Sequence, residues 1–382
     1  MTQRYVVFNE EHDAYRESVR AFVTKELAPH AEEWERAEDF PDEAFRRMGQ
    51  LDLFGNKFEE RYGGTGAGAV FEAVLIEELA RCGSGGVAAG LGAHGQVALP
   101  PIASSGTEEQ KQRWLVPGIR GEKIAALGIT EPGAGSDVSG ISTRAERDGD
   151  DYVLNGGKIF ITNGCRADIV VTAVRTGADP HDGESFIVVE QGTPGFDPST
   201  NLEKLGWRAS DTAQLFFSDC RVPAANMLGG EGAAFPMIMA NFQWERLSMA
   251  LGAVIGAEET LRLATSYASE RVAFNRPIVR FQAIRHKLVE MATEIELARH
   301  LTYHALWLYS QGRDAVKEVS MAKIAATECH THVADEALQI HGGYGYMMEY
   351  PVQRAWRDAR LGPIGGGTTQ IMREIIAKAM DL

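Results

Sequence analysis

The chain has 382 residues and a mass of 41.7 kDa, enough for two or three domains with well-buried cores. Its 53 acidic residues outnumber its 38 basic ones, and the net charge of −15 argues against an electrostatic nucleic-acid binder. No run of about 20 apolar residues is present, so no membrane-spanning helix is expected. The four cysteines are scattered without a CxxC pair, which favours reduced thiols in a cytoplasmic protein.

The first third of the chain carries apolar residues at helical spacing. Helices are predicted over residues 9–38, 42–51, 70–81, 88–104 and 107–116. The sequence from Thr107 to Gln110 is a capping-box pattern that opens the last of these helices, and Pro117 is predicted to end it. Together they predict an N-terminal α-helical domain, residues 1–122.

Beyond residue 123 the pattern changes to short segments rich in β-branched and aromatic residues. Strands are predicted over residues 124–130, 152–162, 169–175, 185–190 and 214–217. Asp148-Gly149-Asp150 and Asn155-Gly156-Gly157 are typical of hairpin turns. A small β domain, sandwich or barrel, is predicted over residues 123–230, with its last strand ending at Arg221-Val222-Pro223.

The last third of the chain is again helical in pattern. Helices are predicted over residues 235–267, 279–311, 316–341, 351–361 and 370–380. Long helices joined by short loops are typical of an antiparallel bundle, which we assign to residues 231–382. The predicted fold class is therefore α+β and multidomain.

Two glycine-rich loops are candidate ligand sites. The segment from Ile129 to Asp137 has glycines that allow close backbone approach, with the hydroxyls of Thr130 and Ser136, and its N–H groups could face a phosphate or a flavin. The segment from Ile364 to Gln370 enters the last helix, where free N–H groups could bind a phosphate. By itself, each pattern is equally typical of an ordinary turn or helix cap.

Glu245 is the candidate catalytic residue. It stands on one helical face with Ile238, Phe242, Met249 and Gly252, so it interrupts an otherwise apolar stripe. A carboxylate in such a place loses hydration, and its raised pKa suits a general base. For an arbitrary glutamate on such a stripe, a structural ion pair is the commoner explanation.

Metal chemistry and the common nucleotide folds are not indicated. The ten histidines form no HExxH, and His330 with His332 has no cysteine at ligand spacing, so no metal site is expected. GxGxxG after a strand and GxxxxGK[ST] are also missing from the sequence.

Five segments resemble, in order and spacing, motifs of the acyl-CoA dehydrogenase family, and the resemblance covers nearly the whole chain. They are Ile129–Asp137 (ITEPGAGSD), Lys158–Gly164 (KIFITNG), Arg271–Pro277 (RVAFNRP), Gln339–Gly345 (QIHGGYG) and Gly367–Gln370 (GTTQ). The resemblance implies an N-terminal helical domain, a middle β-barrel domain, a C-terminal four-helix bundle, bound FAD and a homotetramer.

The resemblance also implies which residues contact the ligands. FAD contacts carried over from the family motifs fall on Ile129, Thr130, Gly135, Ser136, Phe160, Ile161, Thr162, Arg271, Phe274, Gln282, Gln339, Gly342, Gly343, Thr368 and Gln370. The adenine-nucleotide half of FAD is expected partly across a subunit interface. Substrate contacts are expected from Ser136, Arg246, Gly366 and Gly367.

The position of the catalytic base departs from many family members, which carry a glutamate where this chain has Gly366. In the long-chain and isovaleryl-type branches the base lies instead in an E-R-L sequence on the first bundle helix, and here Glu245-Arg246-Leu247 stands there. The resemblance therefore implies α,β-dehydrogenation of an acyl-CoA to a trans-2-enoyl-CoA, as in fatty-acid β-oxidation. Glu245 would be the base, flavin N5 would accept the hydride, and an electron-transfer flavoprotein would accept the electrons.

Other functions remain open at this point. The same scaffold could serve a flavin oxidase or monooxygenase, a dehydrogenase of a carrier-protein thioester, or a non-catalytic binding protein. Because Gly365 and Gly366 carry no side chains, we expect a wider space beside the thioester and tolerance of branched acyl groups.

Overall fold

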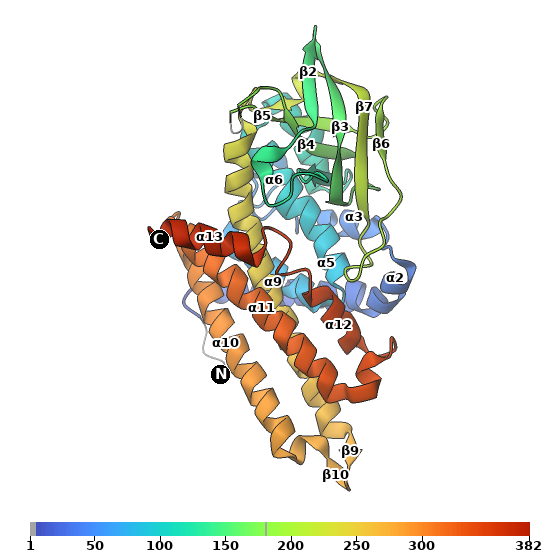
Figure 1. Ribbon diagram of the computed structural model, residues 1–382, viewed down its shortest axis with the longest axis vertical. Helices are drawn as coiled ribbons and strands as arrows, with labels where there is room; N and C mark the ends of the chain where they lie inside the picture. The colour runs from blue at the N-terminus through green and yellow to red at the C-terminus, as the bar shows by residue number, and fades with distance from the viewer. Residues whose placement is uncertain (1–4, 180–181) are drawn as a thin grey trace.

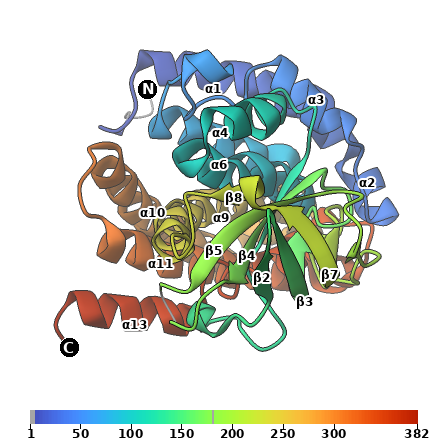
Figure 2. The same ribbon diagram turned by 90° about the horizontal axis from the view of Figure 1, so that it is seen from above.

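The computed structural model describes residues 5–179 and 182–382. Residues 1–4 of the predicted N-terminal domain and residues 180–181 of the predicted middle domain lie outside these ranges. The sheet lies at one end of the molecule and the helix bundle at the other (Figure 1). Seen from above, helix α9 (Ala234–Glu270) lies centrally, between the N-terminal helices, the sheet and the other bundle helices (Figure 2).

The N-terminal part is helical, as predicted. Its α-helices are α1 Glu10–Phe22, α2 Ala31–Ala37, α3 Glu43–Gln50, α4 Ala69–Leu79, α5 Gly85–Gly92, α6 Leu99–Ser105, α7 Glu108–Gln110 and α8 Val116–Ile119. The capping box is confirmed, because the Thr107 side chain accepts from Gln110 N and the Gln110 side chain accepts from Thr107 N. The prediction that Pro117 ends the helix is wrong. A π turn over Lys111–Leu115 leads into α8, where a proline in the first turn needs no N–H.

The middle part forms one eight-stranded sheet in the order β6-β7-β3-β2-β4-β5-β8, with β1 parallel to β4. The strands are β1 Ala125–Gly128, β2 Arg144–Asp148, β3 Asp151–Thr162, β4 Ile169–Arg175, β5 Glu184–Glu190, β6 Phe196–Pro198, β7 Thr212–Pro223 and β8 Met227–Leu228. The turn at Asp148-Gly149-Asp150 is confirmed between β2 and β3. β8 follows Pro223 and pairs with β5, so the strands extend beyond the predicted end.

The second predicted hairpin turn, at Asn155-Gly156-Gly157, is wrong. These residues lie inside β3, whose pairing with β7 shifts register between Leu154 and Gly156. Gly156 has φ of 143°, and a Cβ there would lie 2.7 Å from Thr143. The glycine therefore serves a bulge and a close backbone approach rather than a turn.

The C-terminal part is the predicted bundle. Its helices are α9, α10 Gln282–Ser310, α11 Val316–His341, α12 Pro351–Ala359 and α13 Thr369–Ala379. A hairpin of β9 (Val272–Ala273) and β10 (Arg276–Pro277) joins α9 to α10, which is why α10 begins later than predicted. None of the helices in the described ranges has the length and hydropathy needed to cross a bilayer.

Small residues let the bundle helices approach one another closely. Ala250 and Ala257 of α9 and Ala322 and Ala326 of α11 are all fully buried in one core. A Cβ at Gly256 of α9 would lie 2.5 Å from the His330 ring on α11. This close packing brings polar side chains of α9 and α11 to the same loop, which precedes α13.

Candidate active site

Glu245 lies on α9 and faces the glycine-rich loop before α13. A Cβ placed on Gly366 would lie 3.5 Å from Glu245 Oε1 and 2.7 Å from Met249 Sδ. Met249 is one helical turn beyond Glu245, so the predicted stripe does face this loop. Met249 also fills part of the space that we expected to be open beside Gly366.

The surroundings of Glu245 favour a neutral carboxyl more than an exposed site would. Burial raises the pKa of Glu245, and the positive charges of Arg246 and Lys323 partly oppose this rise. Its carboxylate makes no ion pair with any residue in the described ranges. The structural ion pair considered from the sequence is therefore not formed in this part of the chain.

Two cationic side chains hold successive carbonyls of the glycine-rich loop. Arg246 Nε donates to Gly366 O at 3.1 Å, and Lys323 Nζ donates to Gly367 O at 2.6 Å. The Thr368 side chain accepts from Ile371 N as the N-cap of α13. Gly366 has φ of 61°, a left-handed conformation that favours glycine. The loop is thus fixed opposite Glu245, and Arg246, predicted to bind substrate, contacts the loop.

The first glycine-rich loop, after β1, is anchored by a buried ion pair. Lys158 Nζ donates to Glu131 Oε1 at 2.7 Å and to Ile129 O at 3.1 Å, with both charged side chains almost fully buried. Burial alone would raise the pKa of Glu131, but Lys158 and the donors of Thr143 and Ser142 lower it to about 2. The pair joins the loop to β3.

Backbone and side chains at the end of β3 complete this region. Ile159 N donates to Thr130 O at 2.9 Å, which holds the loop beside the strand. Phe160 has φ of 61° and its side chain is 66% exposed. Ile129 and Ile161 are buried, so only their backbones could meet a ligand. A Cβ on Gly133 or Gly135 would meet nothing within 4 Å in the described part of the chain.

The loop after β1 and Glu245 are linked through a shared core. Ile129 and Ala134 belong to the same buried cluster as Ile238 of α9, and Phe242 packs against that cluster. Phe242 lies nearly one turn before Glu245. The loop after β1 and Glu245 therefore lie on two sides of one packed unit.

Six of the predicted cofactor residues form a separate group. The β9–β10 hairpin is flanked by Arg271 and Gln282 and contains Phe274. In Figure 1 this hairpin lies at the end of the molecule opposite the sheet. The end of α11 contains Gln339 and is followed by Gly342 and Gly343. The next residue, Tyr344, has its ring centre 5.4 Å from the Arg271 guanidinium. Phe274 is 89% exposed. Within the described part of the chain, this group therefore lies away from the loop after β1.

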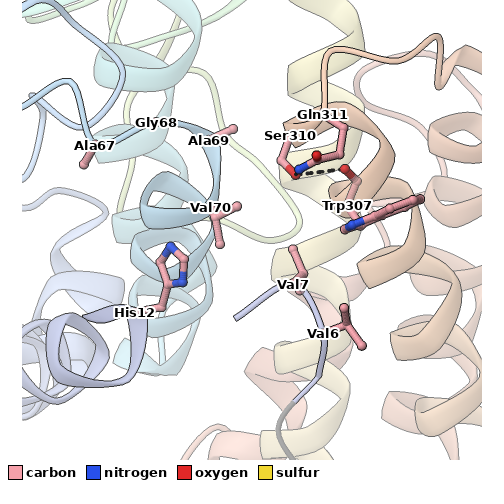
Figure 3. Close-up of a pocket in the computed structure, with 10 residues that line it drawn as sticks. All are labelled: Val6, Val7, His12, Ala67, Gly68, Ala69, Val70, Trp307, Ser310 and Gln311. Atoms are coloured by element: carbon pink, nitrogen blue, oxygen red, sulfur yellow. Dashed lines mark hydrogen bonds between the residues drawn. The ribbon is translucent and has the colours of Figure 1, made fainter. Parts of the chain in front are cut away.

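A surface pocket lies apart from these groups. It opens between the N-terminal segment at Val6 and Val7, the start of α4 and the end of α10 (Figure 3). His12 and Trp307 contribute to its lining. None of its ten lining residues is a predicted site residue.

Some site residues could not be recognised from the sequence. Lys323 gave no signal, because a lysine among buried helix residues cannot be told from one whose long stem reaches solvent. Met249 is recognisable in the sequence only as part of the apolar stripe. Glu131 and Lys158 are recognisable only as members of the family motifs. The distance in sequence between Glu131 and Lys158 hides their pairing.

The chain belongs to the acyl-CoA dehydrogenase family. Residues 9–122, 126–220 and 230–381 match the family's N-terminal, middle and C-terminal domains. It is 42% identical to "Probable acyl-CoA dehydrogenase YngJ" of Bacillus subtilis (strain 168), over 97% of this chain and 98% of that protein. It is 40% identical to the mitochondrial long-chain specific acyl-CoA dehydrogenase of Sus scrofa, over 97% of this chain and 87% of that protein. An acyl-CoA dehydrogenase structure from Geobacillus kaustophilus has a TM-score of 0.95 at 44% identity, with both chains covered fully. The protein is an oxidoreductase with the family's three-domain fold.

Proposed function

We propose that this chain carries out FAD-dependent α,β-dehydrogenation of an acyl-CoA thioester, with Glu245 as the general base. The observation that carries the proposal is the half-buried carboxyl of Glu245, which faces the fixed loop at Gly366 and has no ion-pair partner among residues 5–179 and 182–382. When bound, FAD supplies an acceptor for the hydride of the β-carbon at its N5. The oxidation of a C–C bond then needs only one proton acceptor from the protein.

Glu245 takes the α-proton on a carboxylate oxygen. Its raised pKa brings the base closer to the weakly acidic C–H group than an exposed glutamate would come. The backbone N–H of Gly366 is our candidate donor to the thioester oxygen, where negative charge develops as the proton leaves. Arg246 and Lys323 hold the adjoining carbonyls, so this donor is fixed before substrate binds.

The residues present fit FAD. Phe160 offers an exposed aromatic face beside Thr130 and Thr162, and Gly133 and Gly135 leave room for close approach. These residues would hold the flavin ring. The exposed groups at the β9–β10 hairpin and the end of α11 would hold the adenine-nucleotide half of FAD bound to another subunit, in the homotetramer that the resemblance implies.

The test of this function is anaerobic mixing of the FAD-loaded protein with straight, branched and aryl acyl-CoAs. We expect the visible flavin absorbance to fall with at least one substrate and an enoyl-CoA to appear by mass spectrometry. Reoxidation by an electron-transfer flavoprotein is expected to outpace reoxidation by oxygen. Rapid reaction with oxygen would instead indicate an oxidase, and absence of enoyl product with every thioester would contradict the proposal.

Arg271→Ala is expected to lower FAD content and oligomer assembly together. An arginine that pairs with a pyrophosphate makes charge-assisted hydrogen bonds, and this one would make them at a subunit interface. The measurements are the flavin-to-protein absorbance ratio and the mass in solution. Arg262→Ala is the matched control, because Arg262 is an exposed arginine on α9, the helix that ends just before Arg271. Full flavin occupancy in Arg271→Ala would remove this residue from the site.

Gly365→Tyr is expected to lower kcat/KM for a branched acyl-CoA more than for its straight-chain isomer. Gly365 has no positive φ, and a Cβ there would lie at ordinary contact distance, 3.4 Å from Met249 Cε and 3.8 Å from Leu361 Cγ. A tyrosine can therefore be built, and its ring would narrow the space beside the reacting carbons. One methyl group is worth about 1 kcal/mol in such a pocket, so a severalfold change in the ratio is expected. An unchanged ratio would show that this position does not shape the pocket.

A further inference from the structure

We propose that Lys323 is a positioning residue for the dehydrogenation, which fixes the glycine-rich loop through Gly367 and places a positive charge near Glu245. The inference rests on the proposed role of Glu245 as base. It assigns a function to a residue of α11 that belongs to none of the family motifs recognised in the sequence.

The geometry around Lys323 is that of an internal residue. Its side chain is 0% exposed, and its ammonium donates to Gly367 O at 2.6 Å. The charged groups near it come from α9, namely Glu245 and Arg246. The loop presents the Gly367 carbonyl to Lys323, and α13 presents Met372, whose Cε would lie 2.7 Å from a Cβ on Gly367. Lys323 therefore occupies the junction of α9, α11 and the loop.

A buried ammonium at this junction lowers the stability of the fold unless its surroundings compensate for the lost hydration. Removing a lysine from water is unfavourable, and one hydrogen bond to a carbonyl compensates only in part. Burial and the charge of Arg246 lower the pKa of Lys323 to about 8, while Glu245 opposes this lowering. Lys323 is thus a cation at neutral pH, where its charge favours the ionised form of the base.

This arrangement gives Lys323 two separable effects. The hydrogen bond to Gly367 fixes the loop whose Gly366 N–H is the candidate donor to the thioester oxygen. The charge lowers the pKa of Glu245 from the higher value that burial alone would give. A lysine that only filled space would contribute neither effect to proton removal.

The experiment measures removal of the α-proton alone. An acyl-CoA with sulfur in place of the β-methylene has no β-hydride to lose, so exchange of its α-hydrogen with D2O reports the base without flavin reduction. Exchange is followed by mass spectrometry across pH in the FAD-loaded wild type, Lys323→Gln, Lys323→Met and Lys317→Met. Lys317 is a partly exposed lysine on the same helix and serves as the control.

Both neutral variants of Lys323 are expected to shift the acid limb of the exchange profile upward by about one pH unit, because a carboxylate that loses a nearby cation gains a higher pKa. Lys323→Gln can still donate to Gly367 O, so only Lys323→Met is expected to lower the maximal rate as well, by roughly tenfold. Lys317→Met should match the wild type.

The inference would be overturned if the acid limbs of Lys323→Gln and Lys323→Met coincided with that of the wild type. A drop in the exchange rate that is equal at every pH would overturn it too. If Lys323→Met does not fold, Lys323→Gln decides the question by itself. A separate result tests the underlying function. Exchange that persists in Glu245→Gln would show that Glu245 is not the base, whatever the behaviour of the Lys323 variants.

Discussion

Glu245→Gln is expected to slow flavin reduction by an acyl-CoA by roughly 10³-fold while FAD and substrate still bind. The amide keeps the size of the side chain and cannot accept the α-proton. Stopped-flow absorbance of the FAD-loaded variant gives the rate, and equilibrium titration with an enoyl-CoA gives the affinity. Glu270→Gln, an exposed glutamate at the end of the same helix, is the control and should reduce its flavin at the wild-type rate. A near-normal rate in Glu245→Gln would rule out this base.

The role of Glu245 can also be checked by moving the carboxylate to position 366, on the loop that faces Glu245. Glu245 and a side chain at position 366 approach the same point, because a Cβ on Gly366 would lie 3.5 Å from Glu245 Oε1. Met249 Sδ stands 2.7 Å from that Cβ, and Gly366 has φ of 61°, so Gly366→Glu in Glu245→Gln should restore little activity. Adding Met249→Ala removes the obstructing side chain and should restore more. Equal activity in the double and triple variants would show that Met249 is no obstacle.

The domain order and nearly all helices could be predicted from the sequence, because their signals are local. Apolar spacing and a capping box depend on neighbours within a few residues, and the helix at Val316–His341 was predicted to the residue. The predictions of a helix end at Pro117 and of a hairpin turn at Gly156 and Gly157 were wrong for one shared reason. Both residue types are ambiguous: proline fits a first helical turn as well as a stop, and glycine fits a strand bulge as well as a hairpin.

Which side chains of the candidate site lie together was predictable only where they share one helix face. Glu245 stood out because its stripe can be counted along α9, and the structure places that stripe against the loop at Gly366. Lys323 and Glu131 acquire their surroundings from elements far away in sequence. Their burial depends on how α11 packs on α9 and how β3 crosses the loop after β1, and no local pattern specifies this.

Glu131→Gln is expected to destabilise the protein by about 3–5 kcal/mol, because it leaves the fully buried Lys158 cation without its counter-charge. The loop after β1 would lose the anchor that places Thr130, so flavin content should fall together with stability. Urea unfolding followed by circular dichroism gives the stability, and the absorbance ratio gives the flavin content. The double variant Glu131→Gln/Lys158→Met removes both charges and should be more stable than Glu131→Gln alone.

The pH dependence of this pair has a definite sign. The pKa of Glu131 in the folded protein, about 2, lies below its ordinary value of 4.5. Its contribution to stability is therefore complete above about pH 4.5 and is lost as the pH falls toward 2. The difference in unfolding free energy between the wild type and Glu131→Gln should shrink as the pH is lowered from 5 toward 3. A difference that stays constant over this range, or a double variant no more stable than Glu131→Gln, would show that the charge of Glu131 does not anchor the loop.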